Sequence, residues 1–163
     1  MENEKKQYVS GCELFPLIIE QLEQGRRVSF TVSGSSMMPW IVNNRDSVEL
    51  ISAKNIQLKK GDIILFQPLK HKYVLHRIIK VCPMGDLTAG DGNLYVDGIA
   101  PRKSVIAKAV SIRRKGKEID CETIRWKIVF RIWMLLFPVR GYLLRGMGWM
   151  GRIRKKVYGR HGS

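Results

Sequence analysis

The sequence predicts a mainly β fold, a curled antiparallel sheet or partly open barrel, with a short N-terminal helix and a C-terminal helical basic tail. Short runs rich in β-forming residues follow one another between residues 28 and 112. Turns rich in Gly, Asp and Asn separate these runs. Apolar residues at helical spacing precede them, and basic residues mixed with aromatic ones follow them. Many short strands joined by such turns are typical of all-β layers.

The expected N-terminal helix spans residues 10–25. Ser10 and Glu13 have the spacing of a capping box, in which the two side chains satisfy backbone N–H groups at the start of a helix. Gly25 marks the end, since glycine adopts the left-handed conformation that closes many helices. Four apolar residues recur on one face: Leu14, Leu17, Ile18 and Leu22. We expect this face to pack on the sheet.

The expected strands differ in how their apolar residues are placed. Residues 46–51 alternate polar and apolar side chains, as a half-buried strand does, whereas residues 63–66 are all apolar, as in a strand covered on both faces. The other strands are predicted at 28–32, 73–81 and 105–112, with a brief segment at 87–89. Turns are predicted at 33–39, 43–46, 59–62, 68–72, 83–86, 90–93 and 113–117.

The length and the charge suggest one domain with a basic appendage. At 163 residues, the chain fits a domain over residues 1–122 followed by a tail over 123–163. The boundary follows composition, because no acidic residue occurs from Thr123 to the end. Lys and Arg number 29 against 14 Asp and Glu, which gives a formal net charge of +15. Such an excess predicts an anionic partner: a membrane surface, nucleic acid or an acidic substrate.

The tail has the composition of a segment that lies in a membrane interface. Between residues 124 and 160, aromatic and aliphatic residues are mixed with arginines and lysines, and anionic leaflets attract such clusters. Arg131 interrupts the first apolar run, which argues against a spanning helix. The alternative is a helical hairpin packed on the barrel or on a second subunit. Nucleic acid is not the expected partner, because no recognised binding motif accompanies the charge.

The cysteines and the N-terminus indicate the cellular compartment in which the protein is expected. Cys12, Cys82 and Cys121 are scattered, without the close pairs of a metal motif or the even number of a disulfide framework. We therefore expect a reducing compartment and no bound metal or cofactor. The N-terminus is polar and mixed in charge, unlike a signal peptide, and no stretch has the roughly eighteen uncharged apolar residues of a transmembrane helix. The expected protein is peripheral to a membrane or cytoplasmic.

The most distinctive stretch is Ser-Gly-Ser-Ser-Met-Met-Pro at residues 33–39, between two apolar runs. It places the Ser36 hydroxyl just after a tight turn, where Gly34 leaves room for a substrate backbone. Met37 and Met38 are flexible apolar side chains that suit a substrate groove. The alternative is an ordinary Ser-Gly turn without chemistry.

A serine nucleophile needs a base, and His76 is the candidate. It alternates out of the strand predicted at 73–81, beside Arg77, so we expect it at the surface of the strand. His71, in a basic loop, and His161, in the tail, have the surroundings of solvated surface residues. The alternative for His76 is a structural role within the strand.

A histidine base in turn needs a carboxylate that orients it. The turn region 90–97 holds two, Asp91 and Asp97. Asp91 lies within the tight turn, where a carboxylate commonly caps backbone N–H groups. Asp97 comes later and can reach across to a neighbouring strand. Ser36, His76 and Asp97 would then form a triad, which is recognised by geometry and not by sequence position.

Four segments resemble, in sequence and order, the boxes of the signal peptidase and self-cleaving repressor superfamily. They are residues 34–39, 61–66, 73–77 and 90–93, and the resemblance covers about 28–112. Bacterial signal peptidases and the repressors use a lysine base just before the arginine of the third of these boxes. The endoplasmic-reticulum and archaeal signal peptidases carry histidine there, and here that place is His76, before Arg77.

The resemblance implies a signal-peptidase-like β core and a role for four residues of this chain. Ser36 would be the nucleophile, His76 the base and Asp97 its partner, because Asp97 follows the Gly-Asp turn at the spacing of the His-type enzymes. Asp91 would be a supporting carboxylate.

The resemblance also implies an oxyanion hole, with the main-chain N–H of Ser36 as one donor. Some relatives place a serine two residues before the nucleophile as the second donor. In this chain that position is Gly34, and Ser33 or Ser35 are the candidates to replace it.

The expected function is a serine endopeptidase that cleaves leader or signal-like segments, bound in extended form, at an anionic membrane surface. Two alternatives stay open. One is a non-catalytic membrane- or partner-binding module on a peptidase-like fold. The other is a self-cleaving regulator, for which the region before Val28 is too short to hold a helix-turn-helix and a linker.

Overall fold

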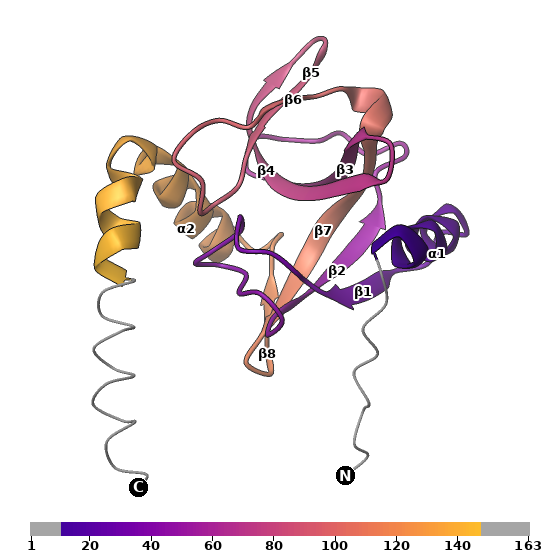
Figure 1. Cartoon of the computed structure of the whole chain (residues 1–163), viewed down its shortest axis with the longest axis horizontal. Coiled ribbons are helices and arrows are strands. Elements are labelled where there is room, and N and C mark those ends of the chain that lie inside the picture. The colour runs from indigo at the N-terminus through magenta and orange to yellow at the C-terminus, as the bar shows by residue number, and fades with distance from the viewer. Residues whose placement is uncertain (1–10, 148–163) are drawn as a thin grey trace, which may run out of the picture.

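One antiparallel sheet organises the molecule (Figure 1). The computed structural model describes residues 11–147, and within them eight strands follow the spatial order β1-β2-β7-β3-β4-β5-β6, with β8 paired to β7. The strands are β1 (Val28–Thr31), β2 (Ser47–Ser52), β3 (Ile63–Leu69), β4 (Lys72–Cys82), β5 (Gly85–Ala89), β6 (Gly98–Ala100), β7 (Val105–Arg114) and β8 (Lys117–Asp120). The sheet is strongly curved but not closed into a barrel, since β1 and β6 lie at opposite ends of this order. The predicted mainly β class is confirmed.

The two longer helices lie at opposite ends of the molecule in Figure 1. They are α1 (Gly11–Glu23), α2 (Ile124–Leu135) and the short 3-10 turns η1 (Arg102–Ser104) and η2 (Phe137–Val139); residues 140–147 are helical again. Helix α1 corresponds to the helix predicted at 10–25 and buries Ile18 and Leu22. Gly25 follows it with a φ of 75°, as the predicted helix end requires. The expected cap, Ser10, lies outside the described residues.

The surroundings of strand β3 explain why residues 63–66 are apolar without alternation. Ile63 and Leu65 belong to the larger apolar cluster, which also contains the buried face of α1. Ile64 and Phe66 point the other way and belong to a second, smaller cluster. Because the sheet curls, both faces of the first half of β3 are covered, and the four apolar residues 63–66 are all buried.

Two strands were not predicted from the sequence. Strand β6 has only three residues, and β8 carries the mixed sequence Lys-Glu-Ile-Asp, so neither shows a clear β pattern. The basic turn expected at 113–117 is narrower than predicted. It is a tight hairpin between β7 and β8 with Lys115 and Gly116 at positive φ.

The C-terminal segment shares its core with the sheet. Phe130 of α2 belongs to the same apolar cluster as the residues of β3, and Trp133 and Met134 are buried beside it. The alternative of a helix packed on the sheet therefore describes this face of α2. Among the described residues, no helix has both the length and the apolar character needed to cross a membrane.

Candidate active site

The loop that carries Ser36 leaves the end of β1 and is held by hydrogen bonds to a neighbouring turn. Gly34 N–H donates to Asn43 Oδ1 at 2.9 Å, and Asn44 N–H donates to Val32 O at the same distance. Gly34 has a φ of 110°, and the space above it is open. This openness agrees with the expectation that a substrate backbone can approach there.

The two methionines of the loop have different environments. Met37 is only 1% exposed and lies in the main apolar cluster, so its assignment to a substrate groove was wrong. It serves as the anchor of the loop, and its carbonyl accepts a bond from Ile41 N–H at 3.0 Å. Met38 is 40% exposed and remains the groove candidate.

Ser36 is half-buried, and of its two backbone polar groups only the carbonyl forms a hydrogen bond within residues 11–147. Its carbonyl accepts a hydrogen bond from Gly92 N–H at 2.7 Å. Within residues 11–147 its own N–H has no hydrogen-bond acceptor, as expected of an oxyanion donor. The neighbouring Ser33 and Ser35 are exposed.

His76 lies in the middle of β4, opposite Ile64 of β3. The sequence suggested an exposed position on the strand, but the residue is only 7% exposed and its ring packs edge-on against Phe66. Burial is the largest influence on the imidazole and lowers its pKa below the usual 6.5. A neutral imidazole at pH 7 follows, which is the form that accepts a proton.

Asp97 faces His76, as the sequence predicted it could. Asp97 Oδ2 lies 3.2 Å from His76 Nδ1. The contact does not have hydrogen-bond geometry, so it is a close approach of the two groups and not a formed hydrogen bond. The same carboxylate accepts bonds from Gly90 N–H and from the Asn93 side-chain amide, each at 2.8 Å.

Asp91 has a different role from the one its turn position suggested. Its carboxylate does not cap the turn but accepts two bonds from Arg77, Nε–H at 2.8 Å and Nη2–H at 2.7 Å, and both side chains are fully buried. Arg77 also donates to Gly61 O and stacks at 4.1 Å on the ring of Phe130. The carboxylate that does cap the turn is Asp97.

The Ser36 loop and the 90–97 loop touch backbone to backbone. A Cβ on Gly90 would lie 2.5 Å from Ser36 O, and one on Gly92 would lie 3.0 Å from Ser35 O. Glycine is needed at both positions because any side chain would push the loops apart. The structure thus brings His76 and Asp97 into contact and bonds the Ser36 backbone to the loop of Asp97.

The hydroxyl of Ser36 is the part of the predicted triad that is not joined. In the described part of the chain it makes no hydrogen bond with His76, whose Nδ1 side faces Asp97. Such bonds are often long in unliganded enzymes and shorten when substrate binds. Because Nδ1 faces Asp97, the other ring nitrogen, Nε2, is the one left to accept a proton.

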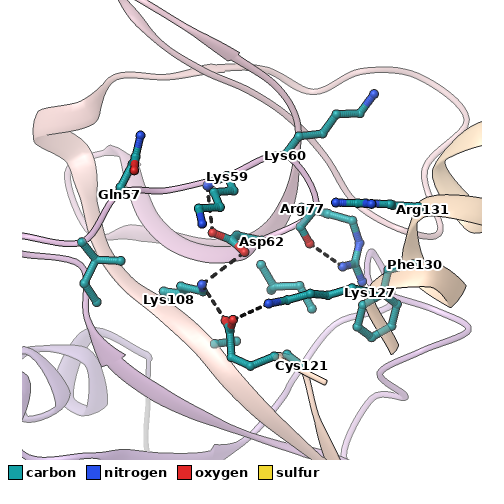
Figure 2. A pocket seen from close by; sticks show the side chains of 15 residues that line it. Gln57, Lys59, Lys60, Asp62, Arg77, Lys108, Cys121, Lys127, Phe130 and Arg131 are labelled. Carbon is teal, nitrogen blue, oxygen red and sulfur yellow. Dashed lines mark hydrogen bonds and ion pairs between the residues drawn. The ribbon is translucent and has the colours of Figure 1, made fainter. Parts of the chain in front are cut away.

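A separate cavity has Arg77 in its wall (Figure 2). Its volume is about 390 Å³, and neither Ser36 nor the His76–Asp97 pair lines it. Lys108 spans its wall, with Nζ 3.2 Å from Asp62 Oδ1 and 2.6 Å from Glu122 Oε1. The cavity lies between the sheet and α2, and cations outnumber carboxylates in its lining. Because no residue of the predicted triad lines it, it is not the candidate active site.

Three residues near the site were missed by sequence reasoning. Asn93 bonds the Asp97 carboxylate, Trp133 Nε1–H donates to Asp91 O at 3.1 Å, and Arg140 donates to Asn93 O. Asn93 had a signal, since it sits in the Gly-Asp-Gly-Asn turn. Trp133 and Arg140 had none, because the tail is full of tryptophans and arginines.

Two further observations bear on identity. Within residues 11–147, no group of three or more His, Cys, Asp or Glu side chains is arranged to hold a metal ion. No protein-family model matches the chain, and no curated protein sequence matches it.

Proposed function

We propose that this protein is a serine endopeptidase of the signal-peptidase-like type, with Ser36, His76 and Asp97 as its triad. The observation that supports it most is the 3.2 Å contact of His76 with Asp97, on a loop whose Gly92 is bonded to the carbonyl of Ser36. The three residues come from segments far apart in the sequence. A purely structural histidine would not require a carboxylate held by two further donors.

The proposed reaction is acyl transfer to Ser36. The Ser36 oxygen attacks the carbonyl carbon of the scissile peptide bond while His76 accepts the hydroxyl proton. The Ser36 N–H stabilises the oxyanion of the tetrahedral intermediate. His76 then donates the proton to the leaving amine as the carbon–nitrogen bond breaks. Water, activated by His76, hydrolyses the acyl-enzyme and regenerates the serine.

The proposed substrate is an extended peptide segment of the leader or signal type. Strand β1 is an edge strand and leads directly into the Ser36 loop. A free strand edge binds an extended peptide by backbone hydrogen bonds. Met38 and the open space above Gly34 lie on the same loop.

The proposed site of action is an anionic membrane surface, bound through the C-terminal segment. The residues of α2 that face away from the sheet are apolar and exposed: Ile124, Ile128, Ile132 and Leu135. Exposed Arg125 and Arg131 flank them. An outward apolar stripe between cations is the arrangement of a helix that lies in a lipid interface. We call these four residues the outer stripe.

A fluorophosphonate probe tests the peptidase proposal without a known substrate. The probe reacts when an activated serine oxygen attacks phosphorus and fluoride leaves, so labelling reports the nucleophile directly. We expect wild-type protein to be labelled on Ser36 and the Ser36→Ala variant not to be labelled. Ser35→Ala, one residue away, is the matched control and should label normally. Labelling that persists in Ser36→Ala, or no labelling of the wild type, would reject the proposal.

The second candidate is a non-catalytic module that binds a membrane or partner. The absence of a Ser36–His76 hydrogen bond and the outer stripe favour it. The same experiment separates the two, because a non-catalytic module leaves Ser36 unlabelled while the vesicle binding of the full chain persists.

A further inference from the structure

The C-terminal segment is bonded to the loop that carries Asp97 at two points. Trp133 Nε1–H of α2 donates to the carbonyl of Asp91 at 3.1 Å. Arg140, which begins the next helix, donates from its guanidinium to the carbonyl of Asn93. A third contact is apolar, since a Cβ on Gly141 would lie 3.3 Å from a methyl of Leu94.

These bonds surround the point where the loop meets the nucleophile. Gly92, between the two bonded carbonyls, donates its N–H to Ser36 O at 2.7 Å. The 90–97 loop is therefore held between the Ser36 loop on one side and the C-terminal segment on the other. A loop of two glycines has little stiffness of its own, so these bonds define its position.

Arg140 is a costly group to bury for packing alone. It is 1% exposed, its Nε has no hydrogen-bond partner, and no carboxylate within the described residues forms an ion pair with it. Its guanidinium stacks 4.1 Å from the ring of Phe137, on its own segment. A buried cation is unfavourable unless its surroundings compensate it. Here the compensation comes from the Asn93 carbonyl and from the nearby charges of Asp91 and Asp97.

The path from Arg140 to the base is short. Asn93, whose carbonyl Arg140 holds, donates its side-chain amide to both oxygens of Asp97 at 2.8 Å. Asp97 faces His76 at 3.2 Å. A shift of Asn93 moves the carboxylate that orients the base.

We infer that Trp133 and Arg140 are positioning residues of the proposed peptidase, which hold the 90–97 loop so that Asp97 faces His76. The inference rests on the proposed function and extends its machinery beyond the segments that resemble peptidase boxes. Residues 124–140 are then part of the active centre and not only a means of attachment.

The test compares Trp133→Phe and Arg140→Gln in the full chain with two matched controls, Trp126→Phe and Arg145→Gln. Trp126 packs on the same aromatic cluster and has no hydrogen bond to the loop among the described residues, and Arg145 is exposed on the same helix as Arg140. We expect the rate of fluorophosphonate labelling to fall roughly 10²-fold in the two test variants, as for a misplacement of about 1 Å. The controls should keep the wild-type rate.

A second readout separates positioning from general stability. Burial has the largest effect on the pKa of His76 and lowers it, as does Lys72, while Asp97 and Asp91 raise it. If the loop moves, the effect of Asp97 weakens, and the pKa of His76 measured by NMR should fall. Arg140→Lys, which keeps a cationic donor, should recover part of both the rate and the pKa.

The outcomes are distinguishable. A wild-type labelling rate and an unchanged His76 pKa in both test variants would overturn the inference. Thermal melts show whether each variant folds, and if Arg140→Gln does not, Trp133→Phe and Arg140→Lys decide the matter. If the wild type is not labelled at all, the peptidase proposal fails. The His76 pKa then still decides whether the two residues hold Asp97.

Discussion

At His76, opposing influences act on one imidazole. Burial under the second apolar cluster favours the neutral ring and has the largest effect on the pKa. Asp97 and Asp91 favour the charged ring, and Lys72 opposes them. The net result is a pKa below 6.5, which leaves His76 free to accept a proton at pH 7.

The labelling rate of Ser36 should therefore depend on pH with an acid limb below 6.5. The rate rises as His76 loses its proton and is level above that value. Asp97→Asn should lower the plateau by several decades, by analogy with about 10⁴ for this change in a serine–histidine–aspartate triad. It should also move the limb to lower pH, because a charge that raises the pKa is removed. Rates measured with the fluorophosphonate from pH 4 to 8 check both effects, and a pH-independent wild-type rate would exclude His76 as the base.

Asp91 and Asp97 should separate stability from chemistry. Asp91→Ala leaves the fully buried Arg77 without its carboxylate, which commonly costs about 3–5 kcal/mol of folding free energy. Asp97 is partly exposed, so Asp97→Asn should change the unfolding free energy little while it abolishes most labelling. Urea unfolding and labelling of each variant give the comparison. If the two variants lose the same unfolding free energy and are labelled at the same rate, neither carboxylate belongs to the triad.

The sequence indicated candidate site residues where residue type carries the signal. A serine in a small-residue turn, a histidine before an arginine and an aspartate after a Gly-Asp turn each stand out by chemistry. Two predictions, that Met37 lines a groove and that His76 is exposed, were wrong for one shared reason. The exposure of Met37 and of His76 depends on which side of a loop or curled strand meets the core, and a short turn or a doubly covered strand has no periodicity that reveals it.

At the scale of elements, α2 has two distinct faces. Phe130 and Trp133 lie against the sheet, while Ile128 and Ile132 are about half exposed on the opposite side. At 100° per residue these pairs point in nearly opposite directions. The sequence predicted a helix with mixed basic and apolar residues but not this division, because apolar residues occupy both faces. The alternatives of a packed helix and an interfacial helix are thus compatible.

The first turn of α2 is fixed by a chain of charges. Glu122 accepts bonds from Lys127 at 2.7 Å and from Lys108 at 2.6 Å. Lys108 also contacts Asp62, the residue before β3 (Figure 2). The lysine contacts lower the pKa of Glu122 to about 2. The Asp62–Lys108–Glu122 chain therefore ties α2 to two strands.

This anchor should weaken in acid. Because Glu122 has a lower pKa in the folded chain than its usual 4.5, the unfolded chain binds more protons between these values. The contribution is fully present above about pH 4.5 and is lost as pH falls towards about 2. Since Glu122 is partly exposed, we expect Glu122→Gln to cost only about 1 kcal/mol at pH 7 and less at pH 3. Urea unfolding at both values tests this, with the exposed Glu118→Gln as the control that should show no such change.

At the scale of the whole molecule, the described part of the tail is packed into the domain and is not a separate appendage. Residues 124–147 contribute Phe130, Trp133 and Met134 to the buried interior. A chain that ends at Glu122 would expose the residues beneath them, and we expect it to unfold at lower urea than the full chain. A truncated chain of native stability would show that this packing contributes little.

Membrane binding must therefore be tested with substitutions on the outer stripe of the full chain. Ile128→Asn with Ile132→Asn changes only exposed side chains and should leave the melting temperature near that of the wild type. Vesicles of phosphatidylserine and phosphatidylcholine should co-sediment the wild type, because each Lys or Arg near the surface contributes ~1 kcal/mol. High salt should release it only partly, since buried apolar area is not screened. The double variant should bind weakly and be released fully by salt.

The matched control for that experiment is Leu17→Asn on α1, which is also exposed but lies at the opposite end of the molecule from α2 (Figure 1). It should bind vesicles like the wild type. If the double variant binds vesicles as well as the wild type, the outer stripe is not the attachment site and the basic side chains alone account for binding. A wild-type protein that ignores anionic vesicles at low salt would exclude the membrane proposal and leave the outer stripe as a surface for a protein partner. Because Trp133 and Arg140 belong to the same segment, a lipid-bound state should also be the one in which Ser36 labels fastest.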